Sequence, residues 1–130
     1  MRNLSQQQIE AVLRLPGPKR YEHFVKQIAD WEKAWGLYAD GWAMAGADEG
    51  GEMLFPLWPA KEYAVLLAKG DWASYQPKDI SLEDLLESVL PTLEREGTKA
   101  AVFLTPEGKS VVIEPRELLE HLRAEARKYE

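Results

Sequence analysis

The sequence predicts an α+β fold: a largely antiparallel sheet of about five strands, with helices packed mainly on one face. Residues 35–58 alternate short β-type runs with turn residues, whereas both flanks carry apolar residues at helical spacing. A chain of 130 residues, of which 45% are hydrophobic and 29% charged, is long enough to bury one core. We therefore expect a single globular domain over residues 1–130.

Two helices are expected before the strands. Ser5 and Gln8 have the spacing of a capping box, and the proline- and glycine-rich residues 15–18 should end the first helix. Pro18 suits the first turn of a second helix. That helix should end near Asp30 and bury a stripe formed by Tyr21, Phe24, Val25 and Ile28.

A tryptophan-lined β-meander should follow. Its strands are residues 35–38, 42–45 and 53–58, with a turn at Asp40-Gly41 and a glycine-rich acidic loop at residues 46–51. Side chains alternate across a strand, so one set should face the helices as a core layer. That set is Trp35, Leu37, Trp42 and Met44, which leaves Tyr38 and Trp58 on the opposite, uncovered face.

The second half of the chain predicts more helices and a hairpin. Pro59 can open a helix over residues 59–69, and residues 71–79 form a connector with a short strand near residues 74–75. A strongly amphipathic helix follows over residues 81–97, and Pro91 should kink or split it. The remaining elements are a hairpin of strands 100–104 and 110–114 and a last helix over residues 115–129.

Charge and composition exclude several classes of protein. The formal net charge is −6, and residues 36–97 carry four Lys/Arg against twelve Asp/Glu. This acidic middle would repel a nucleic acid and suits a basic protein partner better. No apolar run is long enough for a membrane span, and the N-terminus lacks the apolar centre of a signal peptide. With no cysteine, a cytoplasmic location is the simplest interpretation.

The residues offer no catalytic or metal-binding pattern. Only His23 and His121 could supply an imidazole base, and both fall off the apolar stripes of their helices, as solvated histidines do. The loop acids Asp48, Glu49 and Glu52 lack the alternating oxygen ligands of a calcium site and are typical of a solvated hairpin tip. We expect no metal, no cofactor and no catalytic residue, so a non-enzymatic function is favoured.

Two functional hypotheses follow. The first is a protein-interaction module, homodimeric or immunity-like, because Trp and Tyr dominate interaction hot spots although they more often fill cores. Its candidate surface is Tyr38, Trp58, Asp48, Glu49 and Glu52. The second is a small ligand-binding protein or enzyme with a pocket between the 59–69 helix and the 35–58 meander. Its candidate residues are His23, Asp40, Glu62 and Tyr63.

Several motifs together resemble a known family. These are Tyr21-Glu-His-Phe24, Trp35-x-Leu37, Asp40-Gly41-Trp42, Phe55-Pro-Leu-Trp-Pro59 with Glu62-Tyr63-Ala64, Leu82-Glu-Asp-Leu-Leu86 and Val102-Phe-x-Thr-Pro106. Over roughly residues 18–122 the chain is similar to a bacterial family catalogued as domain of unknown function 2750. The resemblance implies a single-domain bacterial cytoplasmic protein and supplies no activity, cofactor or site residue.

A fainter likeness of layout is to the secretion-associated SseB-type domain. In both, a strand that ends in a proline-hydrophobic-aromatic step leads into a helix, and a later strand ends at a proline that opens the next helix. The corresponding pieces here are Phe55–Pro59 and Val112–Pro115. A likeness of fold does not transfer function.

Overall fold

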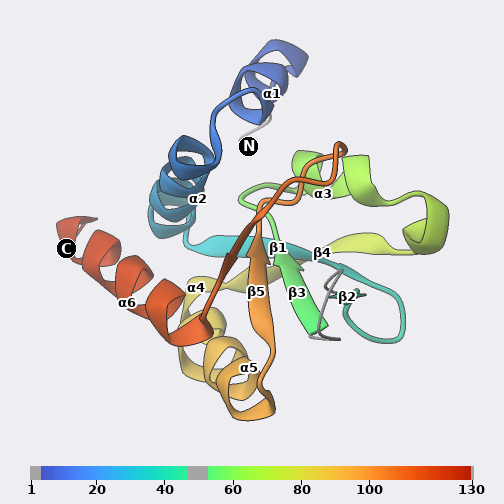
Figure 1. Cartoon of the computed structure of the whole chain (residues 1–130). Coiled ribbons are helices and arrows are strands. Elements are labelled where there is room, and N and C mark those ends of the chain that lie inside the picture. Colours follow the sequence, from blue (N-terminus) through green and yellow to red (C-terminus); the bar gives the residue numbers. More distant parts are fainter. Residues whose placement is uncertain (1–3, 47–52, 130) are drawn as a thin grey trace.

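The computed structural model describes residues 4–46 and 53–129 and has the expected α+β architecture (Figure 1). Its helical elements are α1 (Gln6–Leu13), α2 (Gly17–Trp31), α3 (Lys61–Leu67), η1 (Gly70–Trp72), α4 (Leu82–Asp84), η2 (Leu85–Val89), α5 (Leu90–Glu96), α6 (Pro115–Ala126) and η3 (Arg127–Tyr129). The strands are β1 (Lys33–Tyr38), β2 (Ala45–Gly46), β3 (Met53–Leu57), β4 (Gln76–Ser81), β5 (Lys99–Val102) and β6 (Val111–Ile113).

The strands form a mixed sheet and an attached pair. The mixed sheet has the order β2-β3-β5-β6, and β1 pairs antiparallel with β4 beside it. The predicted hairpin is confirmed by the antiparallel pairing of β5 with β6. β3 and β5 run parallel, which requires the long crossover through α3, β4 and α5. The two groups join where Trp35 and Trp58 exchange backbone hydrogen bonds of 2.9 and 2.8 Å.

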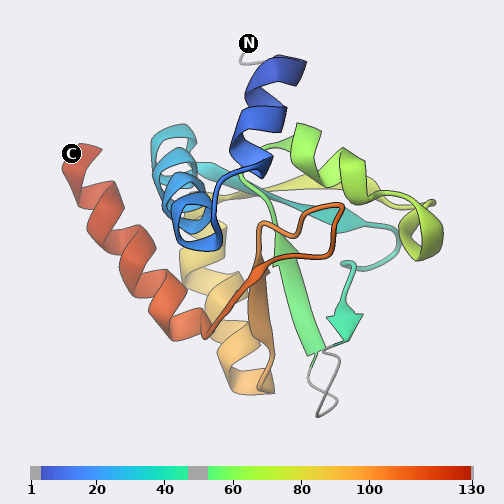
Figure 2. The ribbon, with the colours of Figure 1, turned by 45° about the horizontal axis from the view of Figure 1, so that its top comes forward.

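The helices cover this sheet in two groups. α2, α5 and α6 lie together beside it, with α6 packed against both of the others (Figures 1 and 2). α3 packs against the β1–β4 pair. The first-turn proline of α2 and the glycine at the end of α5, Gly97 with φ +72°, show the expected start and stop signals.

Pro91 disturbs its helix as predicted, without breaking it. The helix passes from α4 through one π-helical turn, η2, into α5, and the Leu90 N–H donates to the Leu85 carbonyl five residues back. Proline has no N–H and its ring crowds the carbonyl four residues earlier. A π turn just before it is a common way to absorb such a disruption.

The predicted meander is wrong in its pairing. β1 pairs with β4, whereas residues 42–44 return beside β1 only through the Tyr38–Trp42 bridge and the bond from the Ala43 N–H to the Leu37 carbonyl. The strand expected near residues 74–75 lies at residues 76–81 instead. Only Ile80 of β4 is fully buried, so this edge strand has almost no apolar signal in the sequence.

The tryptophans are also distributed differently from the prediction. Of the expected core layer only Leu37 is fully buried, and Trp35, Trp42 and Met44 are half-buried. Trp58, which we expected on the uncovered face, is 0% exposed. The reason is that the end of β3 lies between β1 and β5 and is covered on both faces, so strand alternation does not indicate burial there. The largest fully buried side chains are Trp58, Tyr63, Phe24, Phe103, Ile28, Leu37 and Leu57.

Candidate functional site

An apolar groove of about 480 Å³ lies between the strand segments after β1 and the helix formed by η2 and α5. We call it the aromatic groove. The residues on its strand side belong to the predicted meander. The contribution of the helix to a groove was not predicted, because the residues on that side mix apolar side chains with Ser88 and Thr92. The groove is lined by Trp42, Met44, Phe55, Ser88, Val89, Thr92, Leu93 and Glu96.

Trp42 is the residue around which the groove is built. Its ring meets Tyr38 edge-on at 5.1 Å between centroids and lies tilted against Phe55 at 5.7 Å. Such aromatic pairs add about 0.5–1.5 kcal/mol beyond the area that they bury. The indole is nevertheless half-buried, because its remaining surface faces the groove. Trp42 is therefore held in place and still accessible to a partner.

Tyr38 contributes indirectly. It is half-buried, and the Nζ atom of Lys78 lies 4.1 Å from its ring centroid and 5.6 Å from that of Trp42. Because this ammonium group covers the ring, Tyr38 supports Trp42 rather than presenting a free aromatic face. The other members of the predicted interaction surface, Asp48, Glu49 and Glu52, lie outside the described residues, and Trp58 is in the core.

A second group of side chains lies near the carboxyl end of β5, which runs parallel to β3. Phe103 follows β5 with a left-handed backbone, φ +61°, and is fully buried. The Tyr63 ring lies 4.7 Å from it and the His23 ring 6.3 Å. A bulky residue with positive φ is uncommon and marks a conformation that the surroundings impose. His23 and Tyr63, both predicted pocket residues, are thus neighbours of one ring.

His23 and Tyr63 each bury a polar atom without a hydrogen-bond partner among the described residues: His23 Nε2 and the Tyr63 hydroxyl. Burial lowers the pKa of His23, against the effect of its hydrogen bond to Gln27. Burial, with a smaller effect from Glu62, raises the pKa of Tyr63 to about 12. Burial thus favours the neutral form of both side chains. The expectation that His23 is a solvated helical histidine is wrong.

The other two predicted pocket residues do not join this pair. The Glu62 carboxylate accepts a hydrogen bond of 3.4 Å from the Leu4 backbone N–H. Asp40 is exposed in the turn after β1, with φ +58°. None of the interactions seen in residues 4–46 and 53–129 links Asp40 to His23 or Tyr63. The structure thus brings His23 and Tyr63 together; Glu62 affects Tyr63 through its charge alone, and Asp40 is separate from the described interactions of the pair.

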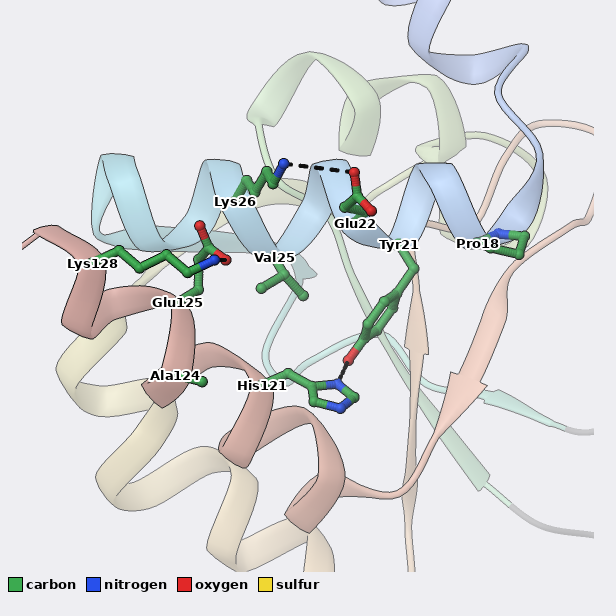
Figure 3. Close-up of a pocket in the computed structure, with 9 residues that line it drawn as sticks. All are labelled: Pro18, Tyr21, Glu22, Val25, Lys26, His121, Ala124, Glu125 and Lys128. Atoms are coloured by element: carbon green, nitrogen blue, oxygen red, sulfur yellow. Dashed lines mark hydrogen bonds and ion pairs between the residues drawn. The ribbon is translucent and has the colours of Figure 1, made fainter.

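A further cavity, of about 350 Å³, opens between α2 and α6 (Figure 3). Tyr21 points from α2 to His121 on α6, with 2.5 Å between its hydroxyl oxygen and Nδ1. Burial and the nearby Glu117 raise the pKa of Tyr21. This pair ties the two helices together. No local pattern predicts this contact, because the partners are 100 positions apart.

In the part of the chain that the structure describes, no group of three or more His, Cys, Asp or Glu side chains could hold a metal ion. No helix within the described ranges has the length and apolar character needed to cross a membrane.

Comparison with known proteins confirms the family resemblance. A family model described as "Protein of unknown function (DUF2750)" matches residues 21–122. The matched segment begins at Tyr21 of the α2–α6 contact and ends at Leu122 in the core, so it contains the aromatic groove and the His23–Tyr63 pair. No curated protein matches the chain.

Proposed function

The chain belongs to the DUF2750 family of proteins of unknown function, and we propose that it is a non-enzymatic module that binds a basic segment of a partner protein in the aromatic groove. The observation that carries the proposal is the position of Trp42. Its indole is fixed by Tyr38 and Phe55 and yet lines an apolar groove. Tryptophan is one of the residue types most enriched at interaction hot spots.

The size of the groove favours a partner that inserts side chains into it over a partner that packs a flat surface against it. About 480 Å³ is within the range of pockets that bind compact ligands, and it has room for one or two large apolar side chains. Val89 and Leu93 form the opposite wall, so a side chain that enters would lose its water on both sides. We therefore expect the partner to insert an aromatic or large aliphatic residue.

Charge favours a basic partner. Glu96 is exposed on the rim of the groove, and residues 36–97 carry twelve acidic against four basic residues. Charge complementarity of this kind speeds association and selects among partners. Lys78 does not line the groove, although its Nζ atom lies 5.6 Å from the ring centroid of Trp42. The basic residues of the partner are therefore expected on the Glu96 side of the groove.

Peptide display tests the proposal without a known partner. A random peptide library is selected on the folded protein, and affinities of the recovered peptides are measured by fluorescence anisotropy. The peptides should share an apolar residue flanked by Lys or Arg. Ser88→Trp, which fills the groove from an exposed position, should weaken binding roughly ten-fold or more, which is the loss of one hot-spot contact. Glu96→Lys should weaken it several-fold, and more at low salt than at high salt.

Glu83 provides matched controls for both changes. It is exposed in α4 and does not line the groove. Glu83→Trp adds the same bulk as Ser88→Trp, and Glu83→Lys makes the same charge reversal as Glu96→Lys, but both lie outside the groove. Both variants should bind the peptides as the wild type does. Peptides that bind Ser88→Trp and Glu83→Trp equally well would refute the groove as the docking site. Sedimentation of the wild type would also show whether a second copy competes for the groove.

A second function, binding of a small polar ligand, is favoured by one observation. His23 Nε2 and the Tyr63 hydroxyl are buried without partners in the described structure, beside the strained Phe103. An unpaired buried polar group costs about 1–3 kcal/mol, so a ligand that pairs with both would regain that energy. Ligands from a small-molecule screen that stabilise the wild type but not Tyr63→Phe would support this function. Equal stabilisation of both proteins would exclude the site.

A further inference from the structure

A polar cavity of about 530 Å³ lies where α2 begins, apart from the sites described above. The connection between α1 and α2 forms one side, and the turn between β5 and β6 forms the other. The lining residues that matter are Arg14, Gly17, Arg20, Glu107, Lys109 and Ser110. Three of these side chains are cationic and one is anionic, in a protein whose formal charge is −6.

Arg20 is the unusual member of this set. Its side chain lines the cavity, but the residue is only 4% exposed. Its Nη1 atom donates a 2.9 Å hydrogen bond to the Leu15 carbonyl, while Nε is buried with no partner in the described structure. A buried guanidinium is rarely left without an anion, because it keeps its charge at any ordinary pH. Arg20 therefore places a buried guanidinium, with one hydrogen bond to the backbone and one unpaired donor, beside the cavity.

The start of α2 adds one backbone donor, the Gly17 N–H, to the same cavity; the next residue, Pro18, has no N–H. α2 has 15 residues, and no described side chain caps its first turn, which begins after Pro16. The N–H groups of a first turn have no partner within the helix and carry the positive end of its dipole. The Gly17 N–H is one of them, and Gly17 lines the cavity. An anion there would accept hydrogen bonds from the backbone as well as from Arg20.

Two exposed cations, Lys109 and Arg14, complete the arrangement. Lys109 is exposed on the β5–β6 turn, whose backbone is fixed by the Lys109 N–H donating to Thr105 Oγ1 at 3.2 Å. The Arg14 side chain is 79% exposed and forms only a 3.7 Å ion pair with Glu10. Such surface pairs contribute little, so Arg14 can turn toward a ligand. Glu107 is the one acidic residue among those that line the cavity, and its charge disfavours an anion there.

We propose that this cavity binds the phosphate group of a small phosphorylated molecule. A tetrahedral dianion offers enough acceptor positions for Arg20, the Gly17 N–H and Lys109 together, whereas a carboxylate has only two oxygens. The volume of about 530 Å³ leaves room for a substituent beyond the phosphate. A nucleic acid is disfavoured, because the acidic residues 36–97 would repel its backbone.

The test is an NMR titration of the whole chain at constant ionic strength, with inorganic phosphate, sulfate, glycerol phosphate and acetate as separate probes. We expect saturable shifts of the Gly17 amide and the Arg20 Nε–H with the three tetrahedral anions, and glycerol phosphate at least as tight as phosphate. Acetate should bind roughly ten-fold more weakly. Shifts that do not saturate, or an affinity for acetate equal to that for phosphate, would overturn the proposal. A lower affinity for glycerol phosphate than for phosphate would show that the cavity does not accept a substituent on the phosphate.

Three variants distinguish phosphate binding in this cavity from a general effect of the net charge of the protein. Lys109→Glu should weaken phosphate binding by about ten-fold, and Glu107→Gln should strengthen it several-fold. Lys69→Glu changes the net charge by the same amount as Lys109→Glu at an exposed position outside the cavity, and should have little effect. The proposal fails if Lys69→Glu and Lys109→Glu weaken binding equally. All three positions are exposed, so each variant should keep the fold.

Discussion

The indole of Trp42 lies directly against Gly36 of β1. A Cβ atom placed on Gly36 would stand 2.9 Å from both Cε3 and Cζ3 of that ring, closer than real Cβ contacts come. The same ring is held by Tyr38 and Phe55, so it cannot simply move aside. The glycine in β1 thus makes room for the residue on which the aromatic groove depends.

The first prediction concerns this contact. Gly36→Ala should lower the free energy of unfolding by about 1–3 kcal/mol, the usual cost of forcing extra volume into a packed site. It should also weaken peptide binding, because Trp42 is displaced. Denaturant unfolding and anisotropy measure the two effects.

Gly41→Ala is the matched control for Gly36→Ala. Gly41 is only five residues away, and a Cβ there meets nothing within 4 Å. Its variant should be within about 0.5 kcal/mol of the wild type. If both alanine variants are equally stable, the tight contact between Gly36 and Trp42 is not a constraint on the fold.

The second prediction concerns the hydroxyl of Tyr63. Because this buried group has no partner among the described residues, Tyr63→Phe removes an unpaired polar atom and keeps the ring against Phe103. The variant should equal or exceed the wild type in stability, by up to about 1 kcal/mol at neutral pH. Thermal unfolding measures it. A loss of more than 1 kcal/mol would mean that the hydroxyl has a structural partner, and would remove the argument for a ligand there.

The third prediction concerns the pH dependence of stability. Burial lowers the pKa of His23 below 6.5, so in acid the unfolded chain takes up a proton that the folded protein resists. The stability due to neutral His23 is complete above the unfolded pKa and is lost as the pH falls below it. The difference in stability between the wild type and His23→Leu should therefore change between pH 7 and 5 and be constant between pH 8 and 9. A difference that is constant from pH 9 to 5 would contradict the burial of His23.

The fourth prediction concerns Trp58. Its Nε1–H donates a 2.8 Å hydrogen bond to the Leu104 carbonyl, and the side chain is fully buried. Trp58→Phe leaves that carbonyl unpaired and opens a cavity, which should cost about 2–4 kcal/mol. Hydrogen exchange should show the Trp58 indole N–H as strongly protected. Rapid exchange at Trp58, or a variant as stable as the wild type, would restore the view that Trp58 is a surface residue.

Local patterns predicted much of this fold. The stripe containing Phe24 and Ile28 identified α2, the amphipathic pattern of residues 81–97 identified the helix from α4 to α5, and the strand pattern of residues 100–104 and 110–114 identified the β5–β6 hairpin. Each of these depends on contacts within one element or between neighbours in sequence. The class of fold was therefore accessible, and so was the irregularity at Pro91.

Long-range pairing is what the sequence could not supply. β4 was misplaced because Ile80 is its only fully buried residue, and its partner β1 is some forty residues earlier in the chain. The prediction that Trp58 is exposed was wrong because Trp58 lies at the end of β3, with β1 on one side and β5 on the other. The aromatic groove could not be predicted for the same reason. Trp42 was recognised as an aromatic residue of the meander, but Ser88 and Thr92 line the groove with it only through tertiary packing.

The most direct test of the interaction proposal is an NMR titration with a display-selected peptide, read at the indole N–H signals of Trp42 and Trp58. The aromatic groove contains Trp42, while Trp58 is fully buried. We predict that the Trp42 signal shifts in proportion to the bound fraction, that Trp58 is nearly unaffected, and that Ser88→Trp abolishes the shift. A peptide that binds without moving the Trp42 signal would contradict the proposal that this groove receives a partner.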